Sequence, residues 1–125
     1  MRPEKKAKPL VFMGSSLEDL RAFPEEVREV MGFALRIAQL GGKHKDAKPM
    51  RGFGGAGVLE IVDDAGGDTY RGVYTVRFEG VIYMLHAFQK KSRKGIETPK
   101  GDLELIKSRL KAAEDHHEHT YRKKK

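Results

Sequence analysis

Two runs rich in β-branched and aromatic residues dominate the middle of the chain, over residues 69–78 and 81–91. Val, Ile, Tyr and Phe are the residues that strands favour, so both runs are expected to be extended. Glu79-Gly80 separates them, and a glycine there accepts positive φ without steric cost, which favours a tight turn. We therefore predict a central β-hairpin over residues 69–91.

The turn sets a register for this hairpin. If Phe78 pairs with Val81, Arg71 lies opposite Phe88 and Val73 lies opposite His86. One face is then almost wholly apolar and is expected to face the core: Gly72, Tyr74, Val76, Phe78, Val81, Tyr83, Leu85 and Ala87. The other, the mixed face, combines bulky apolar residues with cations and a histidine: Arg71, Val73, Thr75, Arg77, Ile82, Met84, His86, Phe88 and Lys90. Such a composition makes the mixed face a candidate functional site.

Three segments have helical patterns. Residues 17–23 follow Ser16, which suits an N-cap and predicts a short first helix. Residues 24–40 carry apolar positions at spacings of three and four, which predicts a longer helix that begins with Pro24 and closes at Gly41-Gly42. Residues 100–114 repeat this spacing and predict the last helix.

The remaining segments complete a small mixed fold. Short apolar runs at residues 9–13 and 58–62 predict two more strands, and the Gly- and Lys-rich segment 43–57 between them is expected to be a loop. Pairing Asp63 with Asp68 would place Glu60 opposite Arg71. The order of elements predicts an α+β fold, with a small antiparallel sheet, two N-terminal helices and one C-terminal helix.

Length and composition narrow the classes of function. The 125 residues predict a single domain, with a basic arm over about residues 1–8 and a polar, fraying tail over about residues 115–125. The net charge of +7 suits a nucleic-acid partner, although it also suits solubility alone. The absence of cysteine excludes disulfides and thiolate metal sites and is typical of a reducing cytoplasm. No apolar run reaches membrane-spanning length, so we expect a cytoplasmic protein with no membrane partner.

Cations and one aromatic ring gather around the mixed face. Phosphates can bind such cations while a base stacks on the ring, a combination that suits RNA. The predicted RNA-binding residues are Lys48, Arg51, Arg77, Phe88, Arg93 and Lys94.

The same face predicts a metal-free cleavage chemistry. A base must accept the proton of the ribose 2′-hydroxyl, a cation must hold the phosphorane charge, and an acid must protonate the leaving oxygen. Arg71 suits the phosphate, and His86 suits an acid or a base. Lys90 or Lys91 suits the base, because neighbouring cations disfavour a protonated lysine.

Structural alternatives remain open for these residues. Arg71 can simply pair with Glu60, and His86 can be a satisfied histidine without a chemical role. No cofactor is expected. No metal site is expected either, because the histidines are mostly in the tail and the carboxylates are dispersed.

The string YRGVYTVRFEGVIYMLHAFQKKSRKGIETPKGDLELIKSRL resembles the RelE/ParE toxin superfamily, in its phage-derived HigB-like branch. The strand with Arg71, the LHAFQKK element, the following Thr98-Pro99 and the closing helix carry the resemblance, together with the earlier KPMRGFGGAGVLEI. It implies the toxin of a type II toxin–antitoxin pair, typically an endoribonuclease that cuts mRNA, often on the ribosome. It also implies an antitoxin with a helix-turn-helix DNA-binding domain, and it matches Arg71 and Lys90 or Lys91 to active-site positions.

Two other functions stay open. A superfamily toxin can act by binding a protein target such as gyrase, and a third possibility is a non-catalytic nucleic-acid-binding regulatory module. The basic cluster favours RNA. The leading interpretation is therefore a ribosome-dependent, metal-independent mRNA endoribonuclease.

Overall fold

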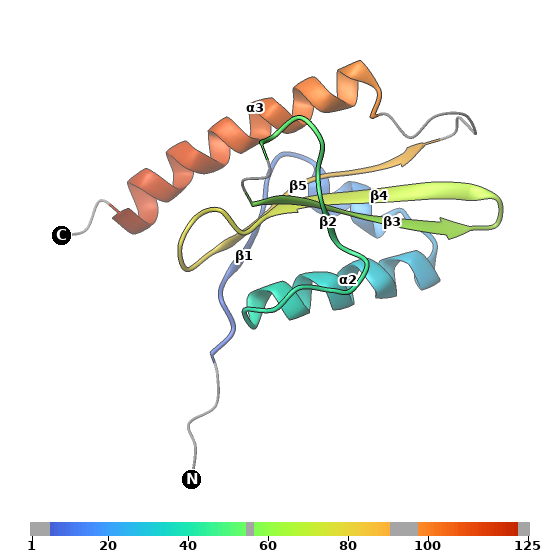
Figure 1. Ribbon diagram of the computed structural model, residues 1–125, viewed down its shortest axis with the longest axis horizontal. Coiled ribbons are helices and arrows are strands. Elements are labelled where there is room, and N and C mark those ends of the chain that lie inside the picture. The colour runs from blue at the N-terminus through green and yellow to red at the C-terminus, as the bar shows by residue number, and fades with distance from the viewer. Residues whose placement is uncertain (1–5, 55–56, 91–97, 123–125) are drawn as a thin grey trace, which may run out of the picture.

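The computed structural model describes residues 6–54, 57–90 and 98–122. The elements are β1 Leu10–Phe12, α1 Ser16–Arg21, α2 Glu25–Gln39, β2 Lys48–Pro49, β3 Val58–Ala65, β4 Asp68–Thr75, β5 Ile82–Lys90, α3 Lys100–His117 and a π-helical turn, η1, Glu118–Arg122. Figure 1 shows the sheet as a middle layer, with α2 along one side of it and α3 along the other. The predicted α+β class, with two N-terminal helices and one C-terminal helix, is confirmed.

The sheet has five strands in the order β1-β5-β4-β3-β2. The neighbours from β5 to β2 are antiparallel, but β1 runs parallel to β5, which corrects the expectation of a wholly antiparallel sheet. A parallel pair needs a long connection, and the two helices and three strands between β1 and β5 provide it. The segment 43–57, expected to be a loop, contains β2, whose Lys48 and Pro49 pair with the β3 residues Glu60 and Leu59.

The helix α2 packs closely on the sheet. Its buried stripe consists of Val27, Met31, Ala34, Leu35 and Ala38, as the spacing predicts. A Cβ atom at Gly72 of β4 would lie 2.6 Å from the Met31 sulfur, so a larger residue there would require the Met31 side chain to shift. Pro24 is the N-cap of α2 and not its first helical residue, a difference of one position.

The β4–β5 hairpin contains an irregularity that changes its faces. Arg71 pairs with Phe88 and Val73 with His86 as predicted, but the register then shifts and pairs Tyr74 with Met84. A shift of one residue reverses every later side chain. Met84 and Ile82 therefore join the core beneath α2, whereas Tyr83 and Leu85 join the core beneath α3. The predicted assignment of residues 81–85 to faces is wrong for this reason.

The turn itself is close to the prediction. Val81 N–H donates to the Phe78 carbonyl at 3.4 Å, and Gly80 has φ of +81°. The strands nevertheless end at Thr75 and resume at Ile82, which makes the connection longer than the predicted two residues.

The C-terminal helix is longer than predicted. α3 reaches His117 and continues into η1, so the expectation of a fraying tail is wrong as far as residue 122. His117 is buried, and its Nε2–H donates to the backbone carbonyl of Glu79 at 2.9 Å. This contact joins the end of α3 to the β4–β5 connection and explains the added helical turn.

Candidate functional site

An open pocket of about 630 Å³ lies where β2, β3 and β4 meet the start of α3. Its lining combines cations, one carboxylate and an apolar wall: Lys48, Pro49, Met50, Arg51, Gly52, Glu60, Val62, Arg71, Thr98 and Leu103. The α3 face of the sheet is therefore not an open platform, because α3 lies over it and leaves this pocket beside its first turn.

Glu60 and Arg71 form an ion pair in the pocket. Arg71 Nη1 donates to Glu60 Oε1 at 2.8 Å, and their side chains are 7% and 17% exposed respectively. The β3–β4 register differs by two residues from the prediction, since Asp68 pairs with Ala65 and Glu60 with Val73. A two-residue shift keeps each side chain on its face, so Glu60 and Arg71 remain neighbours on the diagonal. The predicted pair is confirmed.

The pocket brings together three predicted site residues. Lys48 is the Cα partner of Glu60 across β2 and β3, and Arg51 follows two residues after β2 ends. Both side chains are exposed, and both line the pocket with Arg71. Three cations around one carboxylate can neutralise a phosphodiester and place a proton acceptor beside it.

Glu60 is the site residue that sequence reasoning assigned only a structural role. The sequence did contain a sign of this role, because the predicted strands place the Glu60 carboxylate on the same face as Arg71, the residue expected to hold the phosphate. What the pattern lacked was β2, which brings Lys48 and Arg51 to the carboxylate.

Other predicted residues lie elsewhere. Phe88 is 9% exposed, and its ring stacks on the His86 ring with a centroid separation of 4.7 Å. Lys90 is buried opposite Thr69, and the described residues that line the pocket include neither Phe88 nor Lys90. Lys91, Arg93 and Lys94 lie outside the described residues.

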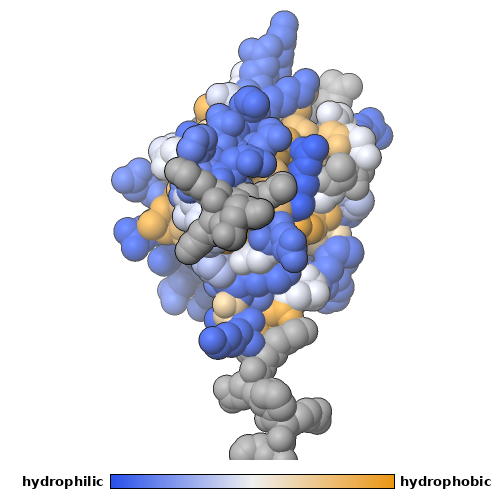
Figure 2. Space-filling model, turned by 90° about the vertical axis from the view of Figure 1, so that its left-hand side faces the viewer, coloured by the Kyte–Doolittle hydropathy of each residue, from blue (hydrophilic) through white to orange (hydrophobic). Residues whose placement is uncertain are grey.

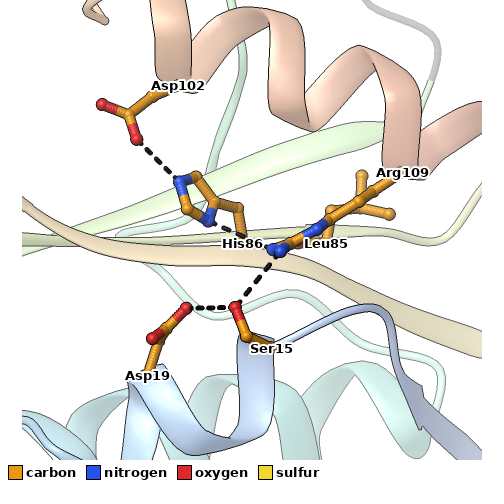
Figure 3. Close-up of polar contacts among 6 residues, drawn as sticks. All are labelled: Ser15, Asp19, Leu85, His86, Asp102 and Arg109. Carbon is orange, nitrogen blue, oxygen red and sulfur yellow. Dashed lines mark hydrogen bonds and ion pairs between the residues drawn. The ribbon is translucent and has the colours of Figure 1, made fainter.

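Both ring nitrogens of His86 have partners, as Figure 3 shows. Nε2 lies 2.8 Å from Asp102 Oδ1, and Nδ1 lies 3.3 Å from Arg109 Nη1. A guanidinium can only donate, so Nδ1 accepts, and the protonated Nε2 donates a hydrogen bond to Asp102 Oδ1. This arrangement assigns His86 the neutral Nε2–H tautomer.

Arg77 lies at a second hollow, two residues beyond the end of β4. This pocket of about 660 Å³ is lined by Arg77, Phe78, Glu79, Glu114, His117, Glu118 and Tyr121. The Arg77 guanidinium sits 5.9 Å from the centroid of the Phe78 ring. Figure 2 views this end of the molecule, where hydrophilic residues surround small hydrophobic areas.

Two buried tyrosines are held neutral. Burial raises the pKa of Tyr74 to about 12, and burial together with the Tyr121 charge raises the pKa of Tyr83 to about 12. The Tyr83 hydroxyl lies 2.8 Å from His116 Nδ1, whereas the Tyr74 hydroxyl has no hydrogen-bond partner in the part of the chain that the structure describes. Neither phenol is suited to accept a proton near neutral pH.

The described ranges contain neither a cluster of metal-ligating side chains nor a membrane-spanning helix. No group of three or more His, Cys, Asp or Glu side chains is placed to hold a metal ion in residues 6–54, 57–90 and 98–122. In the same ranges, none of the helices has the length and apolar character that crossing a membrane requires.

Known proteins place this chain in a family. The family model described as "Phage derived protein Gp49-like (DUF891)" matches residues 18–111. No protein with a curated functional description matches the sequence. A mutant of E. coli toxin RelE in the free state has a similar structure, with a TM-score of 0.54 and 21% identity over 85% of this chain and 97% of that chain. The toxin–antitoxin complex RelBE2 from Mycobacterium tuberculosis gives a TM-score of 0.44 and 19% identity over 73% of this chain and 100% of that chain.

The RelE match supports the fold, and it confirms the predicted resemblance at that level. The family match covers more than half of the chain and agrees with the predicted phage-derived branch. The chain belongs to the phage-derived Gp49-like family and has a RelE-like fold.

Proposed function

We propose that this protein is the toxin of a type II toxin–antitoxin system and that it cleaves mRNA as a ribosome-dependent, metal-independent endoribonuclease. One observation carries the proposal: Lys48, Arg51 and Arg71 line one open pocket together with the Glu60 carboxylate. The RelE-like fold supports it by analogy, because the E. coli protein with that fold is described as a toxin.

The pocket offers each group that 2′-hydroxyl attack requires. Glu60 accepts the 2′-hydroxyl proton while the new bond from O2′ to phosphorus forms. Arg51 and Arg71 hold the non-bridging oxygens, whose negative charge grows in the phosphorane. The bond from phosphorus to O5′ then breaks, and the Lys48 ammonium protonates that oxygen. The products are a 2′,3′-cyclic phosphate and a 5′-hydroxyl.

Glu60 is the base in this proposal because it lines the pocket and Arg71 orients it at 2.8 Å. Lys90 and Lys91 remain the alternative bases that the sequence and the family resemblance suggest. Lys90 is only 7% exposed, which leaves little of this residue accessible to a substrate.

The proposed partner is a cognate antitoxin with a helix-turn-helix DNA-binding domain. An acidic antitoxin segment suits the cationic pocket, and occupying the pocket would inhibit cleavage directly. In the complex, the bound antitoxin should then protect Lys48 from lysine-reactive cross-linkers. A Lys48 as reactive in the complex as in the free toxin would contradict this mode of inhibition.

Cleavage products test the proposed reaction. The purified protein is incubated with mRNA alone and with mRNA on translating ribosomes, and both RNA ends are sequenced. We expect cyclic or 3′-phosphate ends with 5′-hydroxyls, only in the ribosomal sample. Cleavage should require no divalent ion beyond the Mg²⁺ that keeps the ribosomes assembled. Ends that carry 5′-phosphates would eliminate 2′-hydroxyl attack, since activated water leaves such ends.

Labelling in bacteria separates this activity from the alternatives. Expression should stop amino-acid incorporation before thymidine incorporation. An early loss of thymidine incorporation would indicate gyrase, and normal growth would favour a binding module.

A further inference from the structure

We propose that Asp102, His86 and Arg109 act as positioning residues, here called the α3 clamp, that hold the first turn of α3 at the pocket and so determine how tightly RNA binds. The inference rests on the proposed function, because it concerns the same pocket. It also assigns His86 a role other than the acid or base expected from the sequence.

The clamp joins β5 to the wall of the pocket. Asp102 accepts from His86 Nε2–H at 2.8 Å, and the next residue, Leu103, lines the pocket. Consecutive residues of a helix move together, so this hydrogen bond fixes the distance between Leu103 and the sheet. Thr98, just before α3, lines the same pocket.

Arg109 anchors the other end of the clamp. Its Nη1 donates to the Leu85 carbonyl at 3.0 Å, and its Nη2 donates to Ser15 Oγ at 3.2 Å. Ser15 Oγ in turn donates to Asp19 Oδ2 at 2.7 Å. Figure 3 shows these contacts joining α3 to β5 and to the start of α1.

Gly14 leaves room for the anchor. It has φ of +55°, and a Cβ atom there would lie 2.6 Å from Arg109 Nε. The guanidinium therefore occupies space that only a glycine provides, and α3 is held from α1 as well as from the sheet.

The clamp also reaches the strand position of Arg71 through Phe88. The His86 ring stacks on Phe88 with an interplanar angle of 18°, and Phe88 is the Cα partner of Arg71. A continuous set of contacts thus runs from Asp102 through His86 and Phe88 to the strand position of Arg71.

The groups around the His86 ring define the role of each ring nitrogen. The groups that face the ring are Asp102 and Arg109 from α3 and Phe88 from β5, while Asp19 of α1 acts through Ser15 and Arg109. A proton on Nδ1 would point at an Arg109 N–H, and two donors repel. Because neither nitrogen is free to exchange a proton with a substrate, His86 fits positioning better than acid–base catalysis.

Matched variants of one turn of α3 test the clamp. Asp102→Ala removes the acceptor, whereas Asp102→Asn keeps an oxygen for His86 Nε2–H. Glu104→Ala removes the same charge from an exposed neighbouring position and is the control. For each variant, kcat and KM are measured with the RNA that the wild type cuts. Thermal melting verifies folding, and Asp102→Ser replaces Asp102→Ala if the latter does not fold.

We expect Asp102→Ala to raise KM about tenfold with kcat nearly unchanged, the scale of one lost charge-assisted hydrogen bond. Asp102→Asn should restore most of that loss, and Glu104→Ala should match the wild type. Leu103→Ala should also raise KM, and adding Asp102→Ala to it should cost little more, because Asp102 acts through Leu103.

Three results would overturn the inference while leaving the proposed function intact: an unchanged KM in Asp102→Ala, an equal effect of Glu104→Ala, or a fall in kcat alone. A wild type that cuts no RNA refutes the proposed function, and the inference with it. Nitrogen NMR of the His86 ring adds a signature that melting does not report. The neutral ring is expected as the Nε2–H tautomer, and an Nδ1–H tautomer would contradict the clamp.

Discussion

Glu60→Gln separates catalysis from stability at the pocket. In the native protein, Glu60 Oε1 accepts from Arg71 Nη1 at 2.8 Å. Glutamine keeps the shape of the side chain and an oxygen for this hydrogen bond, but it cannot take up a proton as a general base. If Glu60 is the base, kcat should fall by about 10²- to 10⁴-fold, the usual contribution of a general base.

The cost in stability should be much smaller. Breaking a fully buried ion pair costs about 3–5 kcal/mol and a surface pair about 0–1 kcal/mol. The Glu60 side chain is 17% exposed and glutamine retains the hydrogen bond, so we expect a loss of about 1–2 kcal/mol in the free energy of unfolding. That loss lowers the melting temperature by about 5 °C, which leaves a domain of ordinary stability folded at 25 °C.

The assay is single-turnover RNA cleavage by Glu60→Gln, Lys90→Gln, Arg71→Ala and the double variant Glu60→Gln/Arg71→Ala, each melted in parallel. If Glu60 serves only to hold Arg71, Glu60→Gln should cause no further loss of cleavage in the Arg71→Ala background. Cleavage by Glu60→Gln within about twofold of the wild type refutes it as the base, since a base contributes at least about 10²-fold. A large loss in Lys90→Gln in that case would transfer the role to the lysine.

Four further predictions follow from the structure. Lys48→Ala and Arg51→Ala should each weaken RNA binding and reduce the slope of log affinity against log salt by about 0.7; an unchanged slope would remove that residue from the phosphate site. Arg77→Ala should leave RNA binding unchanged because Arg77 lines the second pocket, and a loss equal to that of Arg51→Ala would restore the sequence-based assignment. Tyr74→Phe should raise the free energy of unfolding by about 1 kcal/mol at neutral pH, since it removes a buried hydroxyl without a hydrogen-bond partner in the described ranges. Because the pKa of Tyr74 is raised from 10.0 to about 12, the stability that its neutral form contributes is present below pH 10.0 and is lost as pH rises through about 12, so Tyr74→Phe should reduce alkaline unfolding measured by circular dichroism. Gly72→Ala should cost about 1 kcal/mol in denaturant unfolding, the low end for overpacking, because its Cβ meets the flexible end of Met31, and Met31→Ala should reduce that cost.

The hairpin was predictable and its irregularity was not, for a physical reason. Pairing outward from the Glu79-Gly80 turn placed Arg71 opposite Phe88 correctly. The segment VIYML, however, is apolar at every position, so alternation does not say which residues face which core. The register shift after Val73 depends on helices packing on both faces, and that is tertiary information.

Other parts of the site depend on contacts between distant segments. β2 has two residues, one of them proline, and forms only because β3 offers an edge to pair with. The Asp102–His86 contact requires α3 to dock in one position over β5. By contrast, the Glu60–Arg71 pair survived an error of two residues in the register, because strand side chains repeat with a period of two.

Charge alone does not locate the site. The chain has a net charge of +7, and cations line both pockets, yet the balance among the described lining residues differs between them. At the first pocket Lys48, Arg51 and Arg71 outnumber Glu60. At the second, Arg77 is outnumbered by Glu79, Glu114 and Glu118. A phosphodiester is attracted to the first and repelled by the second, since exposed charges act within about 10 Å at ordinary salt. The pairing of β2 with β3 places Lys48 at the first pocket, so the proposed RNA site belongs at the end of α3 that begins with Lys100.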